Sequence, residues 1–137
     1  LIQCTMDYLS LLKLICDRFP RVRIILDHLG RLTTTEGVKS SNFKNLLSLS
    51  EFSNTFIKIS GFYYCSQQNS PYADLNPFLQ AILESYGVQR CLWGSDFPFI
   101  QEHWDYSGFL EHIKQTKLLS VNESGWLLGK TARNLWW

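Results

Sequence analysis

The sequence has no long hydrophobic run and no excess of charge of either sign. It contains no stretch of about 18 or more apolar residues, which argues against a membrane-spanning helix. No basic segment followed by an apolar one opens the chain, as a secretory signal would. The 13 lysines and arginines nearly balance the 12 aspartates and glutamates, and the net charge of +1 gives no electrostatic reason to expect nucleic acid or an anionic membrane as a partner. We therefore expect neither a nucleic acid nor a membrane as a partner.

Cysteine is also scarce, with Cys4, Cys16, Cys65 and Cys91 as its only occurrences. No two of them form a C-x-x-C pair, and a disulfide-stapled scaffold has denser cysteines in a smaller chain. We interpret them as reduced thiols of a protein in the cytoplasm. One structural disulfide is the alternative that the spacing leaves open.

The chain is long enough for one domain of modest size, covering residues 1–137. Hydrophobic residues make up 45% of it, which is enough to build a core. The first residue is Leu1 rather than methionine, and the chain begins and ends inside apolar segments, "LIQCT" and "ARNLWW". We therefore expect a fragment of a longer protein.

Strand and helix patterns alternate along the chain. Short β-branched or apolar runs typical of strands occupy residues 1–5, 22–30, 55–60 and 88–96. Amphipathic spacing predicts helices over residues 6–20, 40–54, 75–87, 106–116 and 122–135, the last capped by "NESG". Residues 62–75 read as a loop that enters a helix near Pro71. The alternation predicts an α/β fold with a parallel sheet, either an open doubly wound sheet or part of a (β/α) barrel.

Polar side chains follow three of these strands. Gly94 and Pro98 bracket Asp96 and end the third long strand, so its carboxylate lies where the chain opens into a loop. Alternation within each strand puts His28 on the face of Leu26, and Asp96 on the face of Leu92. Lys58 or Ser60 ends the corresponding face of the second long strand. Taken singly, Asp96 could cap its own loop and His28 could be a buried core histidine.

Lys58 has two readings, because a lysine within an apolar strand is costly to bury without a partner. It lies at a sheet edge with its ammonium group in solvent, or it lies inside and pairs with a carboxylate such as Asp96. In the second case the lysine would keep that aspartate ionised.

Four blocks, "PRVRIILDHLG", "NTFIKISGFYY", "VQRCLWGSDFPF" and "LLGKTARNLWW", resemble the amidohydrolase-related (amidohydrolase 2) family of metal-dependent hydrolases, in its lactonase and decarboxylase branch. The resemblance implies a TIM-like (β/α)8 barrel of parallel strands. A complete barrel needs about 250 residues, so the chain looks like the C-terminal part, about four βα units of an incomplete barrel. The family's early His-x-His pair has no counterpart here.

The resemblance also implies site residues. His28 and Asp96 match the family's active-site histidine and late-strand aspartate, so both are expected to be catalytic and to bind a divalent metal, most plausibly zinc, although metal-independent members exist. Lys58, Ser60, Tyr63 and Phe97 are expected to contact substrate. The aromatic residues have an alternative role in packing the barrel rim.

The implied function is hydrolysis of a lactone, or of a similar cyclic ester or amide, by an activated water molecule. The alternatives are a decarboxylase that uses the same groups and a truncated, inactive chain. The expected partner is a small-molecule substrate, and association of copies of the chain into a homo-oligomer is left open. His103 and His112 read as surface residues. If the interpretation is right, the side-chain tips of His28 and Asp96 lie within roughly 3–6 Å, close enough to share one ion.

Overall fold

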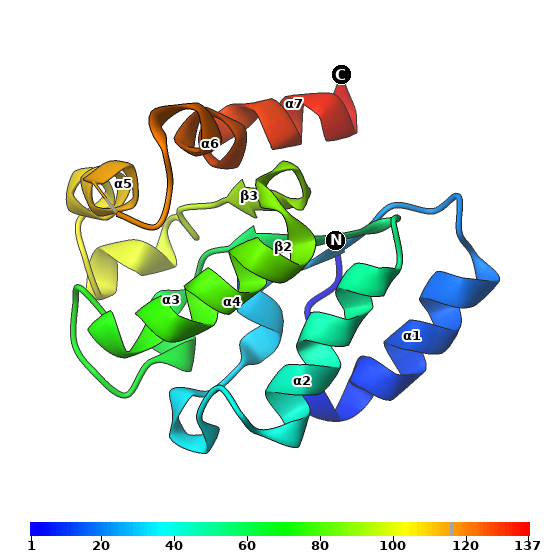
Figure 1. Ribbon diagram of the computed structural model, residues 1–137. Helices are drawn as coiled ribbons and strands as arrows, with labels where there is room; N and C mark the ends of the chain where they lie inside the picture. The colour runs from blue at the N-terminus through cyan, green and yellow to red at the C-terminus, as the bar shows by residue number, and fades with distance from the viewer. Residues whose placement is uncertain (116) are drawn as a thin grey trace.

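The computed structural model describes residues 1–115 and 117–137 and contains a parallel sheet with helices packed against it (Figure 1). Its strands are β1 (Ile24–Leu26), β2 (Thr55–Ile59) and β3 (Cys91–Trp93). They pair in the order β1-β2-β3, and both pairings are parallel. The predicted parallel sheet is therefore confirmed.

The crossovers between strands are helical. α2 (Ser41–Ser48) connects β1 to β2, and α4 (Asn76–Tyr86) connects β2 to β3. α1 (Leu9–Arg18) precedes β1 and lies beside α2, which in turn lies beside α4 (Figure 1). Parallel strands need such crossovers because each must return to the same end of the sheet before the next begins.

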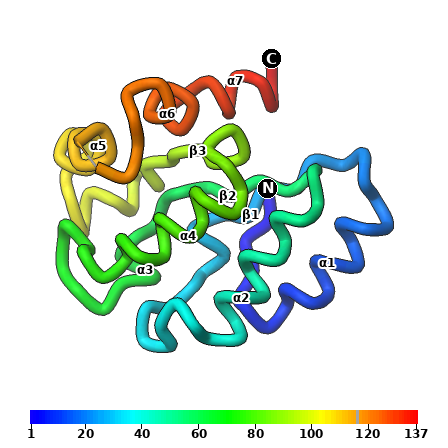
Figure 2. The backbone as a smooth tube through the Cα atoms, in the orientation of Figure 1, coloured from blue at the N-terminus to red at the C-terminus, as the bar shows by residue number. Residues whose placement is uncertain are grey.

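The expected strand at residues 1–5 is reduced to one parallel bridge between Ile2 and Leu26. This bridge places the N-terminal residues alongside β1, on the side away from β2 (Figure 2). Four sheet positions thus follow chain order without a reversal. A doubly wound sheet reverses its strand order at its centre. The strands of the described residues show no such reversal, and this is the order found in the wall of a barrel.

The two faces of the sheet have different roles. Leu26, Ile57 and Cys91 align across the three strands and belong to the hydrophobic core. Lys58 and Leu92 pair on the opposite face. Because Leu26 shares its face with Ile57 rather than with Lys58, the expectation that alternation brings His28 to the face of Lys58 is wrong.

The remaining helices differ in detail from expectation. α3 (Phe62–Cys65) occupies residues read as a loop, because four residues are too few to show helical periodicity. α5 spans Tyr106–Gln115, and the predicted end of this helix at residue 116 lies outside the described residues. α6 (Val121–Gly125), a π-helical turn (Trp126–Lys130) and α7 (Thr131–Trp136) run on from one another. The cap of α6 is Ser120, in a reciprocal capping box with Glu123, rather than "NESG".

Two expectations from the sequence concern the cysteines and membrane-spanning helices. All four cysteines are free thiols, as expected. Among the described residues, no helix is long and apolar enough to cross a membrane.

His112 on α5 is partly buried rather than fully exposed, and its ring lies 5.3 Å from that of Trp104. Burial lowers the pKa of His112, so the unfolded chain binds the proton more readily than the folded one. The free energy of unfolding should therefore fall as the pH drops below about 6.5, by at most about 1.4 kcal/mol per pH unit for one histidine.

We expect His112→Phe to make this pH dependence shallower, as measured by urea denaturation between pH 7.5 and pH 5. Some dependence remains in the variant because burial also lowers the pKa of His28. Identical slopes for the two proteins would contradict the prediction.

Candidate active site

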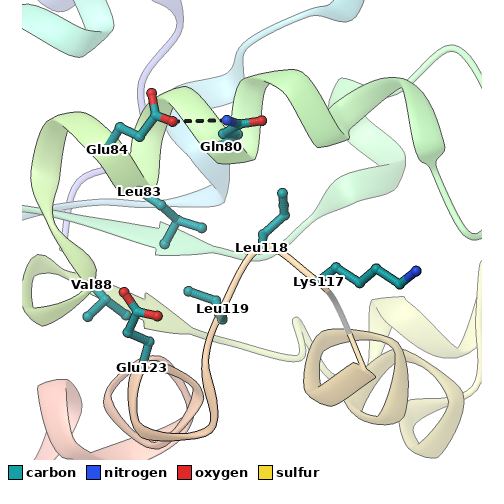
Figure 3. A pocket seen from close by; sticks show the side chains of 8 residues that line it. All are labelled: Gln80, Leu83, Glu84, Val88, Lys117, Leu118, Leu119 and Glu123. Atoms are coloured by element: carbon teal, nitrogen blue, oxygen red, sulfur yellow. Dashed lines mark hydrogen bonds between the residues drawn. The ribbon is translucent and has the colours of Figure 1, made fainter.

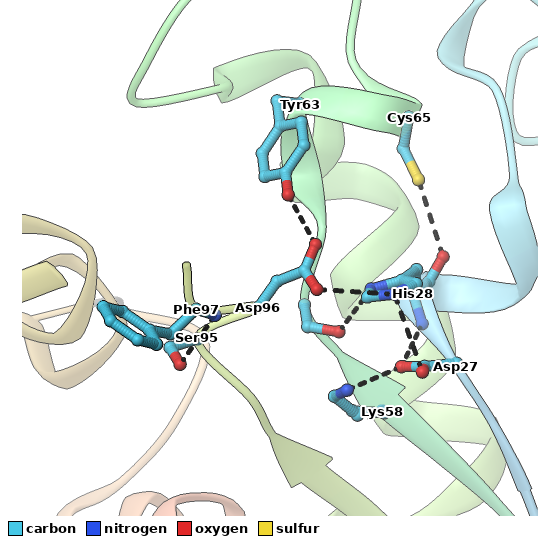
Figure 4. A network of polar contacts seen from close by, with 9 residues as sticks. Asp27, His28, Lys58, Tyr63, Cys65, Ser95, Asp96 and Phe97 are labelled. Atoms are coloured by element: carbon cyan, nitrogen blue, oxygen red, sulfur yellow. Dashed lines mark hydrogen bonds and ion pairs between the residues drawn. The ribbon is translucent and has the colours of Figure 1, made fainter. Parts of the chain in front are cut away.

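The polar residues predicted from the sequence meet at the carboxyl edge of the sheet (Figure 4). His28 follows β1 and Asp96 follows β3. Lys58 is the last residue but one of β2, and Ser60 comes directly after the strand. Parallel strands end on the same edge, so residues far apart in sequence converge there. This edge is where catalytic groups of (β/α) barrels are found.

Asp96 and His28 face one another. His28 Nε2 lies 3.7 Å from Asp96 Oδ1, and the two side chains are 7% and 13% exposed. The expected separation of roughly 3–6 Å is therefore confirmed. The other carboxylate oxygen of Asp96, Oδ2, accepts a hydrogen bond of 2.5 Å from the Tyr63 hydroxyl. Burial, together with this hydrogen bond, raises the pKa of Tyr63, so the phenol remains protonated and able to donate.

The other side of the His28 imidazole is held by Ser60. Nδ1 of His28 lies 3.0 Å from the buried Ser60 hydroxyl. Burial lowers the pKa of His28, although the carboxylates of Asp27 and Asp96 oppose the effect. A lowered pKa leaves the ring neutral near pH 7, the form in which one nitrogen donates and the other accepts.

His28 reaches the site because the chain leaves extended conformation directly after β1. His28, Leu29 and Arg31 have φ angles of 48°, 55° and 54°, all in the left-handed region that non-glycine residues rarely adopt. Asp27 supports the turn, since its Oδ1 accepts the backbone N–H of His28 at 3.0 Å. The turn redirects a side chain that strict alternation would have placed in the helix-packed core.

Lys58 pairs with Asp27 rather than with Asp96. Its Nζ lies 2.8 Å from Asp27 Oδ1, and the two side chains are 20% and 8% exposed. The reading of Lys58 at a sheet edge is therefore wrong, because β2 is the central strand. The reading of an inward lysine paired with a carboxylate is confirmed, but the carboxylate is that of Asp27 rather than Asp96. Gly94 directly follows β3 and leaves space for the Lys58 side chain, because a Cβ at Gly94 would collide with Lys58 Cε.

Asp27 is the site residue that the sequence interpretation missed. Its Oδ2 lies 3.6 Å from His28 Nε2, so it contacts both the imidazole and the ammonium group. The signal was present, because Asp27 and Lys58 are opposite charges at the ends of neighbouring strands. Recognising it needed the pairing register, which sets Leu26 against Ile57 and hence Asp27 on the face of Lys58.

Phe97 and His103 follow Asp96 in the chain and differ in how they relate to this cluster. Phe97 is 65% exposed and its ring points away from Asp96 (Figure 4), so the structure does not bring it to the cluster. Its substrate contact stays a prediction. His103 is exposed as expected, but its ring stacks on Tyr63 with 3.9 Å between centroids.

A divalent metal would find part of a ligand set here. His28 Nε2 and Asp96 Oδ1 are suitable zinc donors, but Asp27 already binds Lys58 and a backbone N–H. The described residues contain no group of three His, Cys, Asp or Glu side chains that could hold an ion. Structural and catalytic zinc sites use at least three protein ligands, so these residues do not form a complete metal site by themselves.

Gly61 lies so close to the His28 imidazole that there is no space for a Cβ at this position, and its replacement should disturb the site. Gly61 has a φ of 62°, and a Cβ there would lie 2.7 Å from His28 Nδ1. Gly37 is a matched control, since its φ is 74° and no described atom lies within 4 Å of its Cβ position. We expect Gly61→Ala to lower the free energy of unfolding by about 1–3 kcal/mol more than Gly37→Ala, because only the former adds overpacking to backbone strain. Equal losses in urea denaturation would contradict this contact.

Comparison with known proteins gives a consistent pattern. The amidohydrolase family Amidohydro_2 matches residues 2–136. A 4-sulfomuconolactone hydrolase from Rhizobium radiobacter is 41% identical over 75 residues, which cover 55% of this chain and 25% of that protein. An L-fucono-1,5-lactonase from Burkholderia ambifaria is 28% identical over 117 residues, covering 81% of this chain and 39% of that protein.

The fold has a counterpart among solved structures. An amidohydrolase from Burkholderia multivorans with bound zinc superposes with a TM-score of 0.78 at 24% identity. The match covers 97% of this chain and 50% of that one. The three parallel strands and their helices thus correspond to half of a TIM-barrel structure, and the chain spans half or less of the length of these proteins.

Proposed function

This chain belongs to the amidohydrolase 2 family, and from that premise we propose that it carries the water-activating groups of a lactone hydrolase. The observation that supports this most is the arrangement of Asp96. One carboxylate oxygen is held by Tyr63 and the other faces His28 at 3.7 Å, at the carboxyl edge of the sheet. Relatives that act on lactones support the choice of substrate.

Asp96 is the general base in this proposal. Its Oδ1, the oxygen that Tyr63 does not bind, accepts a proton from water as the water oxygen attacks the lactone carbonyl. The carbonyl carbon becomes tetrahedral, and then the bond to the ring oxygen breaks. Asp96 returns the proton to that departing oxygen, so one lactone and one water give one hydroxy acid and the carboxylate is regenerated.

His28 orients the reacting groups. If the Ser60 hydroxyl donates to Nδ1, then Nε2 carries the ring hydrogen and can donate to Asp96 or to the carbonyl oxygen of the substrate. Lys58 neutralises Asp27 within 2.8 Å, which limits the negative charge that a developing oxyanion meets. Tyr63 fixes the carboxylate so that one defined oxygen is presented to water.

A bound divalent ion would lower the pKa of a water ligand to about 7 and polarise the carbonyl. His28 and Asp96 are the residues of this chain that would hold it. The further ligands that a complete site needs are not found together among the described residues, and the steps above use only groups of the chain.

The test is hydrolysis of a panel of lactones by the purified protein, followed as acid release, with and without added zinc or chelator. We expect turnover of at least one lactone above the rate in buffer. The same samples are assayed for carbon dioxide from aromatic carboxylates, which distinguishes the decarboxylase alternative. Absence of lactone turnover under all conditions would contradict the proposed function and favour the inactive-chain alternative.

A further inference from the structure

A polar hollow of about 540 Å³ adjoins the catalytic cluster. Tyr63 is the wall that the two share, because its hydroxyl binds Asp96 while its ring stacks on His103, another lining residue. The volume lies within the range of small-molecule sites, about 300–1,000 Å³. A substrate whose carbonyl lies at Asp96 could therefore extend into this hollow.

The hollow is lined by groups that hydrogen-bond neutral hydroxyls. Gln67, Gln68 and Asn69 line it. Their side chains end in amides, each with two donor hydrogens and an acceptor oxygen. Glu102 contributes a carboxylate. No lysine or arginine of the described residues lines it, so Glu102 is the lining carboxylate that an anionic substituent would meet, with the imidazole of His103 as the neighbouring titratable group.

The loop that carries these amides is anchored by its own hydrogen bonds. The Asp74 carboxylate accepts from the Ser66 hydroxyl at 2.5 Å, from the Thr34 hydroxyl at 2.6 Å and from the backbone N–H of Gln67 at 2.9 Å. These bonds connect the loop to the segment after β1 and hold it against the site. A fixed loop loses less freedom on binding than a mobile one, which favours recognition.

We propose that this hollow binds the hydroxylated part of a neutral sugar lactone, and that the protein prefers such lactones to carboxylated or sulfonated ones. The inference rests on the proposed function and narrows its substrate class. The relatives do not decide between anionic and neutral lactones, since one acts on a sulfonated lactone and another on a sugar lactone. The lining of the hollow favours the neutral class, because the Glu102 carboxylate repels an anionic substituent, whereas amides can both donate to and accept from hydroxyl groups.

A second hollow of about 440 Å³ provides controls (Figure 3). It lies against α4, and its lining includes Gln80 and Glu84, which hydrogen-bond each other at 2.9 Å. None of the catalytic cluster lines it. Substituting Gln80 and Glu84 makes the same chemical changes as substituting Gln68 and Glu102, but in a hollow away from the catalytic cluster.

The experiment compares kcat/KM of the purified protein for D-galactono-1,4-lactone, the hydroxyl-free δ-valerolactone and the dianionic 2-pyrone-4,6-dicarboxylate. We expect the sugar lactone to be preferred. Gln68→Ala should raise KM for it about tenfold with little change in kcat, the loss of about one hydrogen bond. Glu102→Gln should shift the ratio toward the dicarboxylate about tenfold, while Gln80→Ala and Glu84→Gln change neither value.

Preference for the dicarboxylate, or an unchanged ratio in Glu102→Gln, would overturn the inference and leave the lactone hydrolase standing. Binding is measured separately from turnover by titrating the ¹⁵N-labelled protein with D-galactono-1,4-lactone. Shifts of the side-chain amide signals of Gln67, Gln68 and Asn69 support the hollow even if no lactone is hydrolysed, a result that would defeat only the proposed function. Absence of such shifts at saturating sugar lactone would overturn the hollow as its binding site.

Discussion

Replacing Asp96 with asparagine is expected to lower kcat for lactone hydrolysis by about 10²- to 10⁴-fold, the usual contribution of a general base. The amide has the shape of the carboxylate and can still accept the hydrogen bond from Tyr63, but it cannot take a proton from water. KM should change little, because the substituted group acts on the water rather than on the binding of the lactone. The rate is measured at saturating lactone.

The control for this variant is Asp17→Asn, which makes the same chemical change on an exposed position of α1. Its kcat should equal that of the wild type. The urea midpoints of both variants should lie close to the wild-type value, which separates lost chemistry from lost folding. Full turnover by a folded Asp96→Asn protein would remove this carboxylate from the mechanism.

Replacing Lys58 with methionine is expected to lower the free energy of unfolding by about 3–5 kcal/mol, the cost of leaving a buried charge without its partner. The Asp27 carboxylate is 8% exposed and loses an ion pair of 2.8 Å. Methionine preserves most of the side-chain volume above Gly94, so the loss reports the charge rather than a cavity.

Two further variants test this interpretation. Lys114→Met removes the lysine of an exposed pair with Glu111, whose side chains are 46% and 54% exposed, and should cost at most about 1 kcal/mol. Adding Asp27→Asn to Lys58→Met should recover much of the lost stability, because the unpaired charge is then absent. A loss in Lys58→Met no larger than in Lys114→Met would show that the Asp27–Lys58 pair is unimportant for folding.

The strands and the positions of their polar ends could be predicted from the sequence, for a local reason. Apolar β-branched runs closed by glycine mark buried strands, and the carboxyl ends of parallel strands must meet at one edge. That logic predicts that His28 and Asp96 lie at the same edge of the sheet, although not which face each side chain takes. The alternation of strands and helices allows either a doubly wound sheet or a barrel. The resemblance of four sequence blocks to the amidohydrolase 2 family favours the barrel.

The orientation of the charged residues could not be predicted, because it depends on features that span several elements. Alternation sorts residues within one strand, but only the register between β1 and β2 puts Asp27 rather than His28 on the face of Lys58. His28 then enters the site through a left-handed turn that nothing in its local sequence demands. The capping box at Ser120, by contrast, depends on a local S-x-x-E pattern, so this helix start is predictable from the sequence alone.

The Asp96 carboxylate and the His28 imidazole act on one another at the carboxyl edge of the sheet. The pKa of His28 reports this interaction and can be followed by ¹⁵N NMR of the imidazole in the wild-type protein and in Asp96→Asn. Because the Asp96 carboxylate raises that pKa against the effect of burial, its removal should lower the value further, while Glu111→Gln should leave it unchanged. A His28 pKa that is the same in Asp96→Asn as in the wild type would contradict the account.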